Sequence, residues 1–187
     1  INYANMLTRQ GLSDKAEASY RKAMEIAPSS VSACVGLGQL LLSKKRVSEA
    51  VGIFRQAVDL EPDNPEAWRL LASAQADAGQ ADAAESSLAK CLELDPTDSA
   101  AAFALATLMR LQGKLAEAVP LYQRALQHCT HATACLVAAN FSEVLADLGQ
   151  KNDAINILTE VLGLFPDFAE GWNNLGTLYL GLGRFED

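Results

Sequence analysis

The residues of this 187-residue chain best suited to chemistry are two histidines and two cysteines that lie within eight residues of one another. They are His128, Cys129, His131 and Cys135. Imidazole and thiolate groups can together bind zinc, but this spacing matches no known zinc motif. A disulfide between Cys129 and Cys135 is an alternative if the compartment is oxidising. We favour an irregular loop with free thiols, and we therefore predict no metal and no other cofactor.

The rest of the chain offers no recognisable catalytic arrangement. Both histidines lie in the segment above, so a serine, histidine and aspartate triad cannot be assembled elsewhere. Gly113-Lys114-Leu115 lacks the preceding glycine-rich loop and strand that would cradle a phosphate. Cys34 and Cys91 fall at positions expected to be buried, where a free cysteine behaves as a small hydrophobe. We therefore predict that this segment is not an enzyme, whatever the full-length protein contains.

The composition limits the classes of partner. The chain has 15 Lys and Arg against 23 Asp and Glu, a formal net charge of −8 that repels phosphate backbones and anionic membrane surfaces. Its longest apolar stretch is far shorter than the roughly 20 residues of a membrane span. Four dispersed cysteines fit a reducing compartment. We expect neither nucleic acid nor membrane as a partner, and a cytoplasmic location.

Prolines and glycines reveal an internal repeat. Pro28, Pro62 and Pro96 are 34 residues apart, and Pro166 lies 70 residues further on. A period of about 34 residues is typical of stacked helical repeats. A single insertion of two residues after Pro96 explains both this series and a second one, in which a lysine stands among glycines: Gly11, Lys45, Gly79, Gly113, Gly149 and Gly183.

Small and large residues fill fixed positions of the repeat. Two helices that cross closely leave room only for small side chains between them. One position is always alanine and a second is always small: Ala16, Ala50, Ala84, Ala118 and Ala154, then Ala4, Gly38, Ala72, Ala106, Ser142 and Gly176. Two others are large: Leu37, Leu71, Leu105, Phe141 and Leu175, then Tyr20, Phe54, Leu88, Tyr122 and Leu158. Each period divides at its glycine into two segments of helical periodicity, which predicts an antiparallel helix pair.

These positions resemble the tetratricopeptide repeat family. One unit carries the family pattern at Trp68, Leu71, Ala72, Gly79, Ala84 and Pro96, and residues 172–179 match it more closely still. The resemblance implies an all-α fold, a right-handed superhelical α-solenoid of helix-turn-helix repeats. It implies one array over 1–187, with partial repeat 1–30, repeats 31–64, 65–98, 99–134 and 135–168, and partial repeat 169–187.

Two features of the array depart from regularity. Thr130 replaces the repeat's proline beside the insertion, so we expect the helix before it to continue longer before the turn. The last repeat stops at its first helix, which leaves the apolar side of Trp172, Leu175 and Tyr179 without a covering helix. We expect self-association or fraying there.

The resemblance places a partner on the first helix of each pair, which lines the concave groove in this family. The candidate peptide-binding residues are Asn5, Val35, Gln39, Arg69, Ser73, Phe103, Thr107, Arg110, Asn140, Glu143, Asn173 and Asn174. Lysines that hold an acidic tail in some family members are absent, so a strongly acidic peptide is disfavoured. Phe103 is the best candidate for an apolar anchor in the groove.

Recurring asparagines in the groove allow two interpretations. Asn2, Asn140 and Asn174 resemble the asparagine ladder of the repeat domain that precedes a nucleocytoplasmic O-linked sugar transferase. The ladder is interrupted at Gly36, Leu70 and Ala104. Amides there could clamp a peptide backbone, because each offers donors and an acceptor. They could equally be tolerated surface residues.

Three functions follow as hypotheses. The first is a protein–protein interaction scaffold or adaptor that binds a peptide or protein segment in the concave groove. The alternative is the substrate-targeting segment of a larger enzyme such as a glycosyltransferase or sulfotransferase. The third is a structural array that assembles with itself.

Overall fold

The computed structural model describes residues 2–184, apart from the side chains of residues 131 and 132. Throughout this part of the chain the regular structure is α-helical, with short turns between helices. The helices are α1 (Asn2–Arg9), α2 (Ser13–Ile26), α3 (Val31–Ser43), α4 (Val47–Leu60), α5 (Pro65–Asp77), α6 (Ala81–Leu94), α7 (Ser99–Leu111), α8 (Leu115–His128), α9 (His131–Asp147), α10 (Lys151–Leu164) and α11 (Ala169–Gly181).

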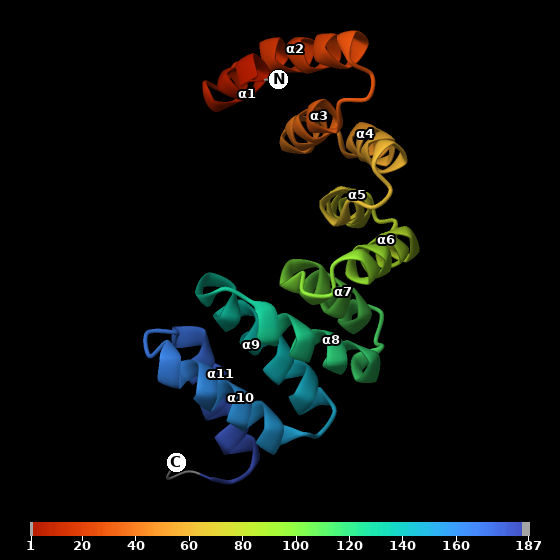
Figure 1. Cartoon of the computed structure of the whole chain (residues 1–187). Coiled ribbons are helices and arrows are strands. Elements are labelled where there is room, and N and C mark those ends of the chain that lie inside the picture. Colours follow the sequence, from red (N-terminus) through yellow and green to blue (C-terminus); the bar gives the residue numbers. More distant parts are fainter. Residues whose placement is uncertain (1, 185–187) are drawn as a thin grey trace. The chain divides into compact units, whose positions relative to one another are not determined.

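The helices form two compact units, Ile1–Pro96 and Thr97–Asp187, which we describe separately. In the first unit α1, α3 and α5 pair with α2, α4 and α6, and α3 also contacts α5 (Figure 1). In the second unit α7 pairs with α8 and α9 with α10, while α9 also contacts α7 and α11. We call the exposed surface of α1, α3 and α5, and that of α7, α9 and α11, the first-helix face of each unit.

The small and large repeat positions form the core, as the sequence predicts. Each member of the alanine series, from Ala16 to Ala154, is 0% exposed. Both series of large residues are also buried. Because methyl groups occupy the closest approach, the backbones of paired helices lie near each other and large side chains pack around them. Gly176 is the exposed exception in the second small series.

The turns inside the pairs explain the glycine series. Its glycines have φ between 72 and 78°, a left-handed conformation that is unfavourable for residues with a Cβ. Lys45 occupies the same turn with φ 61° and is the single non-glycine residue of positive φ within the described chain. The turn is therefore conserved in geometry across the repeats although its residue type changes. Its cost at Lys45 is about 1 kcal/mol.

Polar side chains begin several first helices. The side chain of Ser30 accepts a hydrogen bond from Ala33 N at 3.3 Å, and that of Asp98 accepts one from Ala101 N at 2.9 Å. Asn64 caps α5 in the same way. These contacts satisfy amides that have no partner inside a helix, so the polar residues that follow Pro28, Pro62 and Pro96 define where the next repeat begins.

The prediction of a longer helix before Thr130 is wrong. α8 ends at His128 after 14 residues, the same length as α6. Cys129 and Thr130 are extended, with ψ 156° and 163°, and this ends the helix without a proline. The insertion instead lengthens the next helix, because α9 has 17 residues where α7 has 13. α9 thus begins at His131, ahead of the repeat start expected at residue 135.

A cluster of charged residues joins the first two helix pairs. Glu17 on α2 accepts hydrogen bonds from Lys44 and Arg46 of the α3–α4 turn, both at 2.7 Å, and from Arg21 at 3.0 Å. The Glu17 side chain is only 14% exposed. The hydrogen bond from Lys44, and then those from Arg46 and Arg21, lower the pKa of this carboxyl from 4.5 to about 2 against the opposing effect of burial.

This cluster predicts a loss of stability in acid. Because the folded-state pKa of Glu17 is lowered, its contribution is fully present above about pH 4.5 and is lost as the pH falls towards about 2. We expect that contribution to be about 1 kcal/mol, since its cationic partners are partly solvated. Thermal unfolding between about pH 7 and about pH 3 should show a smaller acid-induced decrease in Tm for Glu17→Gln than for the wild type.

The control for this measurement is Glu25→Gln. Glu25 is bound to Lys22 in an exposed pair, with a side chain that is 67% exposed. Its removal should leave the acid dependence of Tm unchanged. Equal acid slopes for Glu17→Gln and the wild type would contradict the assignment.

Candidate functional site

The predicted binding residues of the first unit lie on its first helices. Asn5, Gln39 and Ser73 are exposed, on α1, α3 and α5 respectively, whereas Val35 and Arg69 are half-buried. Three of these residues line one pocket of about 290 Å³. The pocket is lined by Asn5, Val31, Ser32, Val35, Gly36, Gln39, Glu61, Asn64 and Glu66. Arg69 and Ser73 are outside it.

The floor of this pocket depends on a missing side chain. A Cβ added at Gly36 would clash with the ring of Tyr20, a buried residue of α2. The Tyr20 hydroxyl donates a hydrogen bond to Asn5 Oδ1 at 2.5 Å, between the two helices of the first pair. The interruption of the asparagine series at Gly36 therefore has a steric cause, because Tyr20 occupies the space.

Two residues of the α4–α5 turn line this pocket although the sequence did not place them there. Glu61 and Asn64 lie in the α4–α5 turn, and Glu66 is in the first turn of α5. Asn64 Oδ1 accepts hydrogen bonds from Glu66 N and Ala67 N, and its Nδ2 donates to Glu61 Oε2 at 2.7 Å. The sequence did not indicate that this turn would face the same pocket as α3.

Three predicted residues of the second unit form one hydrogen-bonded group. Arg110 on α7 donates to Glu143 Oε2 and to Asn140 Oδ1 on α9, each at 3.4 Å. The Asn140 Nδ2 donates in turn to the Leu136 carbonyl at 2.9 Å. Arg110 therefore acts as a bridge between neighbouring first helices, and its charge is offset by Glu143.

Phe103 and Thr107 pack against the core of the second unit. Phe103 is half-buried and meets the Tyr122 ring edge-on at 6.0 Å, and Tyr122 stacks on Phe141 at 5.6 Å. The Thr107 hydroxyl lies 3.4 Å from that of Tyr122 and donates to the Phe103 carbonyl. The exposed edge of Phe103 is thus held rigidly. Leu111, the last residue of α7, is 75% exposed.

Asn174 carries a buried polar atom, Nδ2, that the described residues leave without a hydrogen bond. It borders a small, mainly apolar pocket of about 100 Å³ between α9 and α11, lined by Ser142, Glu143, Ala146, Asn174, Thr177 and Leu178. Asn173 is exposed, and its carbonyl accepts a hydrogen bond from Thr177. An unpartnered buried donor is costly, which favours an added acceptor at this point.

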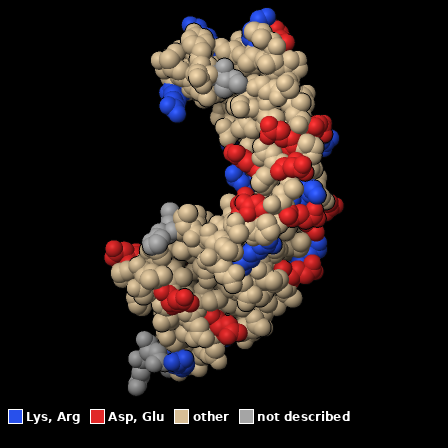
Figure 2. Space-filling model, in the orientation of Figure 1, with Lys and Arg blue, Asp and Glu red and all other residues tan. Residues whose placement is uncertain are grey.

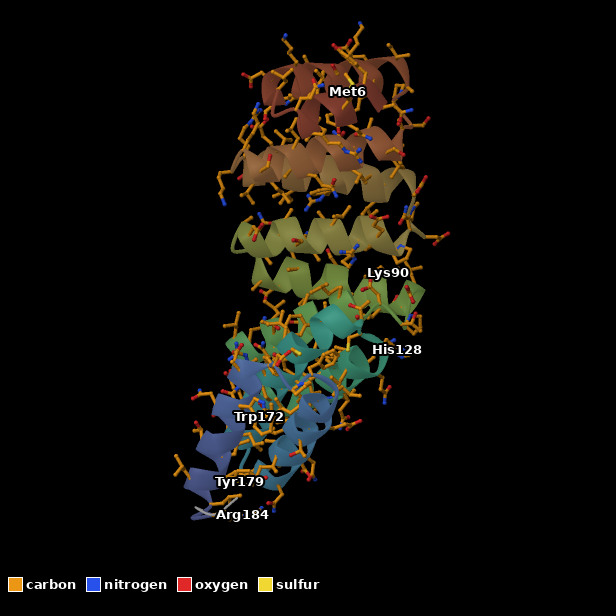
Figure 3. All side chains as sticks on the ribbon, turned by 90° about the vertical axis from the view of Figure 1, so that its left-hand side faces the viewer. Met6, Lys90, His128, Trp172, Tyr179 and Arg184 are labelled. Carbon is orange, nitrogen blue, oxygen red and sulfur yellow. The ribbon has the colours of Figure 1, made fainter. Side chains whose placement is uncertain are left out.

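The segment of histidines and cysteines is a helix junction. Cys129 and Cys135 are half-buried free thiols, so the disulfide is not formed. Cys129 Sγ donates to the Leu126 carbonyl at 3.2 Å, and burial raises the pKa of its thiol. No metal-binding group of three ligands occurs among the described side chains, and the side chain of His131, one of the four residues considered as zinc ligands, lies outside them. His128 is exposed at the end of α8 (Figure 3).

The remaining cysteines are buried, as predicted. Cys34 and Cys91 are 1% and 0% exposed. Burial raises the pKa of the Cys34 thiol, so the protonated form that packs as a small hydrophobe is favoured.

The two tryptophans share a contact that the repeat pattern did not reveal. Trp68 Nε1 donates to the Pro62 carbonyl at 2.7 Å, and Trp172 Nε1 donates to the Pro166 carbonyl at 2.8 Å. Each indole thereby fixes the proline turn that precedes its own helix. Trp172 is nevertheless 53% exposed on α11, and Arg184 lies 4.9 Å above the Tyr179 ring on the same helix (Figure 3).

No helix in the described part of the chain is both long enough and apolar enough to cross a membrane. Acidic and basic side chains are interspersed over α3 to α6, and the visible face of the second unit is largely uncharged (Figure 2).

Known families match the chain along most of its length. A family model described as tetratricopeptide repeat matches residues 7–74, and a second with the same description matches residues 141–187. The model of anaphase-promoting complex, cyclosome, subunit 3 matches residues 77–161. The repeat motif of the sequence is therefore found by independent comparison.

Two curated proteins are similar to the chain in sequence. Human protein O-mannosyl-transferase TMTC3 is 24% identical over 182 residues, which is 96% of this chain and 20% of that protein. RNA polymerase-associated protein CTR9 of Caenorhabditis elegans is 34% identical over 76 residues, 39% of this chain and 7% of that protein. The chain thus spans only a small part of the length of either relative.

Solved structures share the fold. YrrB, described as a TPR protein with an unusual peptide-binding site, superimposes with a TM-score of 0.73 at 23% identity, over 92% of this chain and 88% of that one. A MamA structure gives 0.77 at 17% identity, over 93% and 95%. A tetratricopeptide repeat protein of Parabacteroides merdae gives 0.78 at 17%, over 98% and 72%. These matches confirm the predicted all-α solenoid fold.

Proposed function

Because this chain belongs to the tetratricopeptide repeat family, we propose that it is an interaction scaffold or adaptor that binds a peptide or protein segment on its first-helix face. The observation that carries the proposal is the pocket of the first unit, where Asn5, Gln39 and Glu66 gather on three different first helices. Side chains of this kind can bind both the donors and the acceptors of a peptide backbone.

The second unit supports the same proposal. Asn174 has a buried amide nitrogen without a partner, next to a small apolar pocket. A backbone carbonyl of a bound peptide would satisfy that nitrogen, while an adjacent apolar side chain would enter the pocket. Asn140 is engaged with Arg110 and Leu136, so it would have to exchange these contacts in order to bind.

The experiment is a binding screen with arrayed capped peptides, followed by affinity measurement by fluorescence anisotropy. Two variants test the two units: Asn5→Ala with Gln39→Ala, and Asn140→Ala with Asn174→Ala. We expect at least one of them to weaken the tightest peptides about tenfold, because each lost hydrogen bond contributes about 0.5–1.5 kcal/mol.

A matched control removes two amides from the opposite side. Gln56 on α4 and Gln123 on α8 are exposed on second helices, so Gln56→Ala with Gln123→Ala should leave affinity unchanged. Thermal unfolding of each variant checks that it is folded. Equal affinities for all variants, or equal loss in the control, would place binding elsewhere than the first-helix face.

A second candidate function is the substrate-targeting segment of a larger enzyme, such as a glycosyltransferase or sulfotransferase. What favours it is the similarity to protein O-mannosyl-transferase TMTC3 over 96% of this chain. Reading the whole gene tests it: a transferase domain in the same reading frame supports this role, and a reading frame of repeats alone refutes it.

Self-association is a third possibility that the exposed side of α11 supports. Trp172 and Leu180 are 53% and 63% exposed there. Contrary to the expectation, Leu175 is buried against the preceding helices and Tyr179 is half-buried. Light scattering over a range of concentrations tests it, and a constant monomer mass would refute it.

A further inference from the structure

The pocket of the first unit is lined by two glutamates that have no cationic partner among the described residues. Glu61 and Glu66 line it, both are exposed, and neither forms an ion pair with any cation in the described part of the chain. No lysine or arginine lines the pocket. Arg69 follows Glu66 by three residues on α5 but is outside the lining.

Two other carboxylates of the same unit, by contrast, are bound by basic side chains. Glu17 is bound by Lys44, Arg46 and Arg21, and Glu49 by Arg46 at 2.6 Å. Two carboxylates that line one pocket without a lysine or arginine beside them favour a ligand that carries a positively charged group. A ligand group that complements this pocket is therefore positively charged.

The remaining lining specifies how such a group would be held. Val35 and the Cβ-less Gly36 are among the lining residues, and the methylene stem of a long basic side chain could lie along them. The Asn5 oxygen is taken by the Tyr20 hydroxyl, so Asn5 offers mainly its amide donors, and Gln39 offers an acceptor as well. A volume of about 290 Å³ accommodates one side chain and lies just below the range of pockets that bury whole small molecules.

We propose that this pocket selects a lysine or arginine side chain of the bound peptide, so that the partner of the first unit is a basic segment. The inference rests on the proposed function, because it specifies the ligand of the same first-helix face. The net charge of −8 acts in the same direction, since it attracts basic segments over a longer range.

The test is a cycle that pairs protein and peptide changes. The probes are capped peptides that contain one arginine or lysine, compared with the same peptides carrying citrulline or acetyl-lysine, which remove the charge and keep most of the shape. The protein variant is Glu61→Gln with Glu66→Gln. We expect the neutral peptide to bind the wild type about tenfold more weakly, and the protein variant to bind the charged peptide about as weakly.

The decisive measurement is whether the change in the protein and the change in the peptide lower the affinity through the same interaction. In the protein variant the neutral and charged peptides should bind equally, because the two changes remove the same interaction. The matched control, Glu25→Gln with Asp59→Asn, removes two exposed carboxylates from the second helices α2 and α4 and should retain the preference for charge. If the two changes act independently, or if the wild type ignores the charge, the inference is overturned while peptide binding itself stands. If no arrayed peptide binds the wild type, both the inference and the proposed function fail.

Discussion

Tyr122→Ala is expected to destabilise the second unit by about 4 kcal/mol, the cost of removing a large aromatic side chain from a packed interior. Tyr122 is 0% exposed, stacks on Phe141 of α9 and meets Phe103 of α7 edge-on. It therefore links three helices from two consecutive pairs. The residue one turn earlier on α8 is the buried Ala118, whose methyl group is too small to fill the cavity.

Hydrogen exchange measured by mass spectrometry would locate the effect. Since each repeat contacts only its neighbours, amides of α7 to α9 should lose protection first, while those of α2 to α4 should retain it. Chemical denaturation gives the size of the change. Tyr122→Phe is the control: it keeps the ring and removes only the hydroxyl 3.4 Å from Thr107, so it should cost less than about 1 kcal/mol. A cost as large as that of Tyr122→Ala would mean that the hydroxyl, and not the aromatic stack, carries the stability.

The repeat architecture could be predicted because its causes are local and recur. A glycine at a left-handed turn, a proline after a second helix and an alanine at a helix crossing each reflect a steric requirement of a single pair. Lys45 shows the strength of this reasoning, because it was assigned to the glycine series by position and adopts the same positive φ.

The position of the irregular junction could be predicted from the sequence, but which of its two helices is lengthened could not. Two inserted residues near Thr130 can be added either to the end of α8 or to the start of α9. The outcome depends on the balance between continuing α8 and starting α9 earlier, and α9 gained the residues. No spacing in the sequence distinguishes these two outcomes.

The sequence predicted which helices carry the candidate site, but it did not predict the contacts that the side chains of the site form. The repeat pattern places Asn5, Gln39 and Arg110 on first helices because helical periodicity fixes which residues share a side. It does not reveal that Arg110 donates to Asn140, or that Glu61 completes a pocket with residues of α1 and α3. Such contacts join different repeats, and their geometry depends on side-chain rotamers and turn conformation.

Ala84→Leu is expected to destabilise the first unit by about 3 kcal/mol, at the upper end of the cost of overpacking. Ala84 is 0% exposed where α6 packs against α5. A leucine there must either push the two helices apart or adopt a strained rotamer. Separation would also disturb the buried hydrogen bond from Ser87 Oγ to Gln75 Oε1, 2.7 Å long, which joins the same helices. Chemical denaturation would measure the loss.

Two control substitutions on α6 test whether the effect of Ala84→Leu is steric. Ala89 is exposed on α6, so Ala89→Leu should alter stability by no more than about 0.5 kcal/mol. Ala84→Gly leaves the crossing open and should cost about 1 kcal/mol, the difference in helix propensity. If the cause is steric, Ala84→Leu must therefore destabilise the protein more than Ala84→Gly does. If leucine at this position were tolerated as well as glycine, the helices would have room to separate, and the strict alanine series would need another explanation.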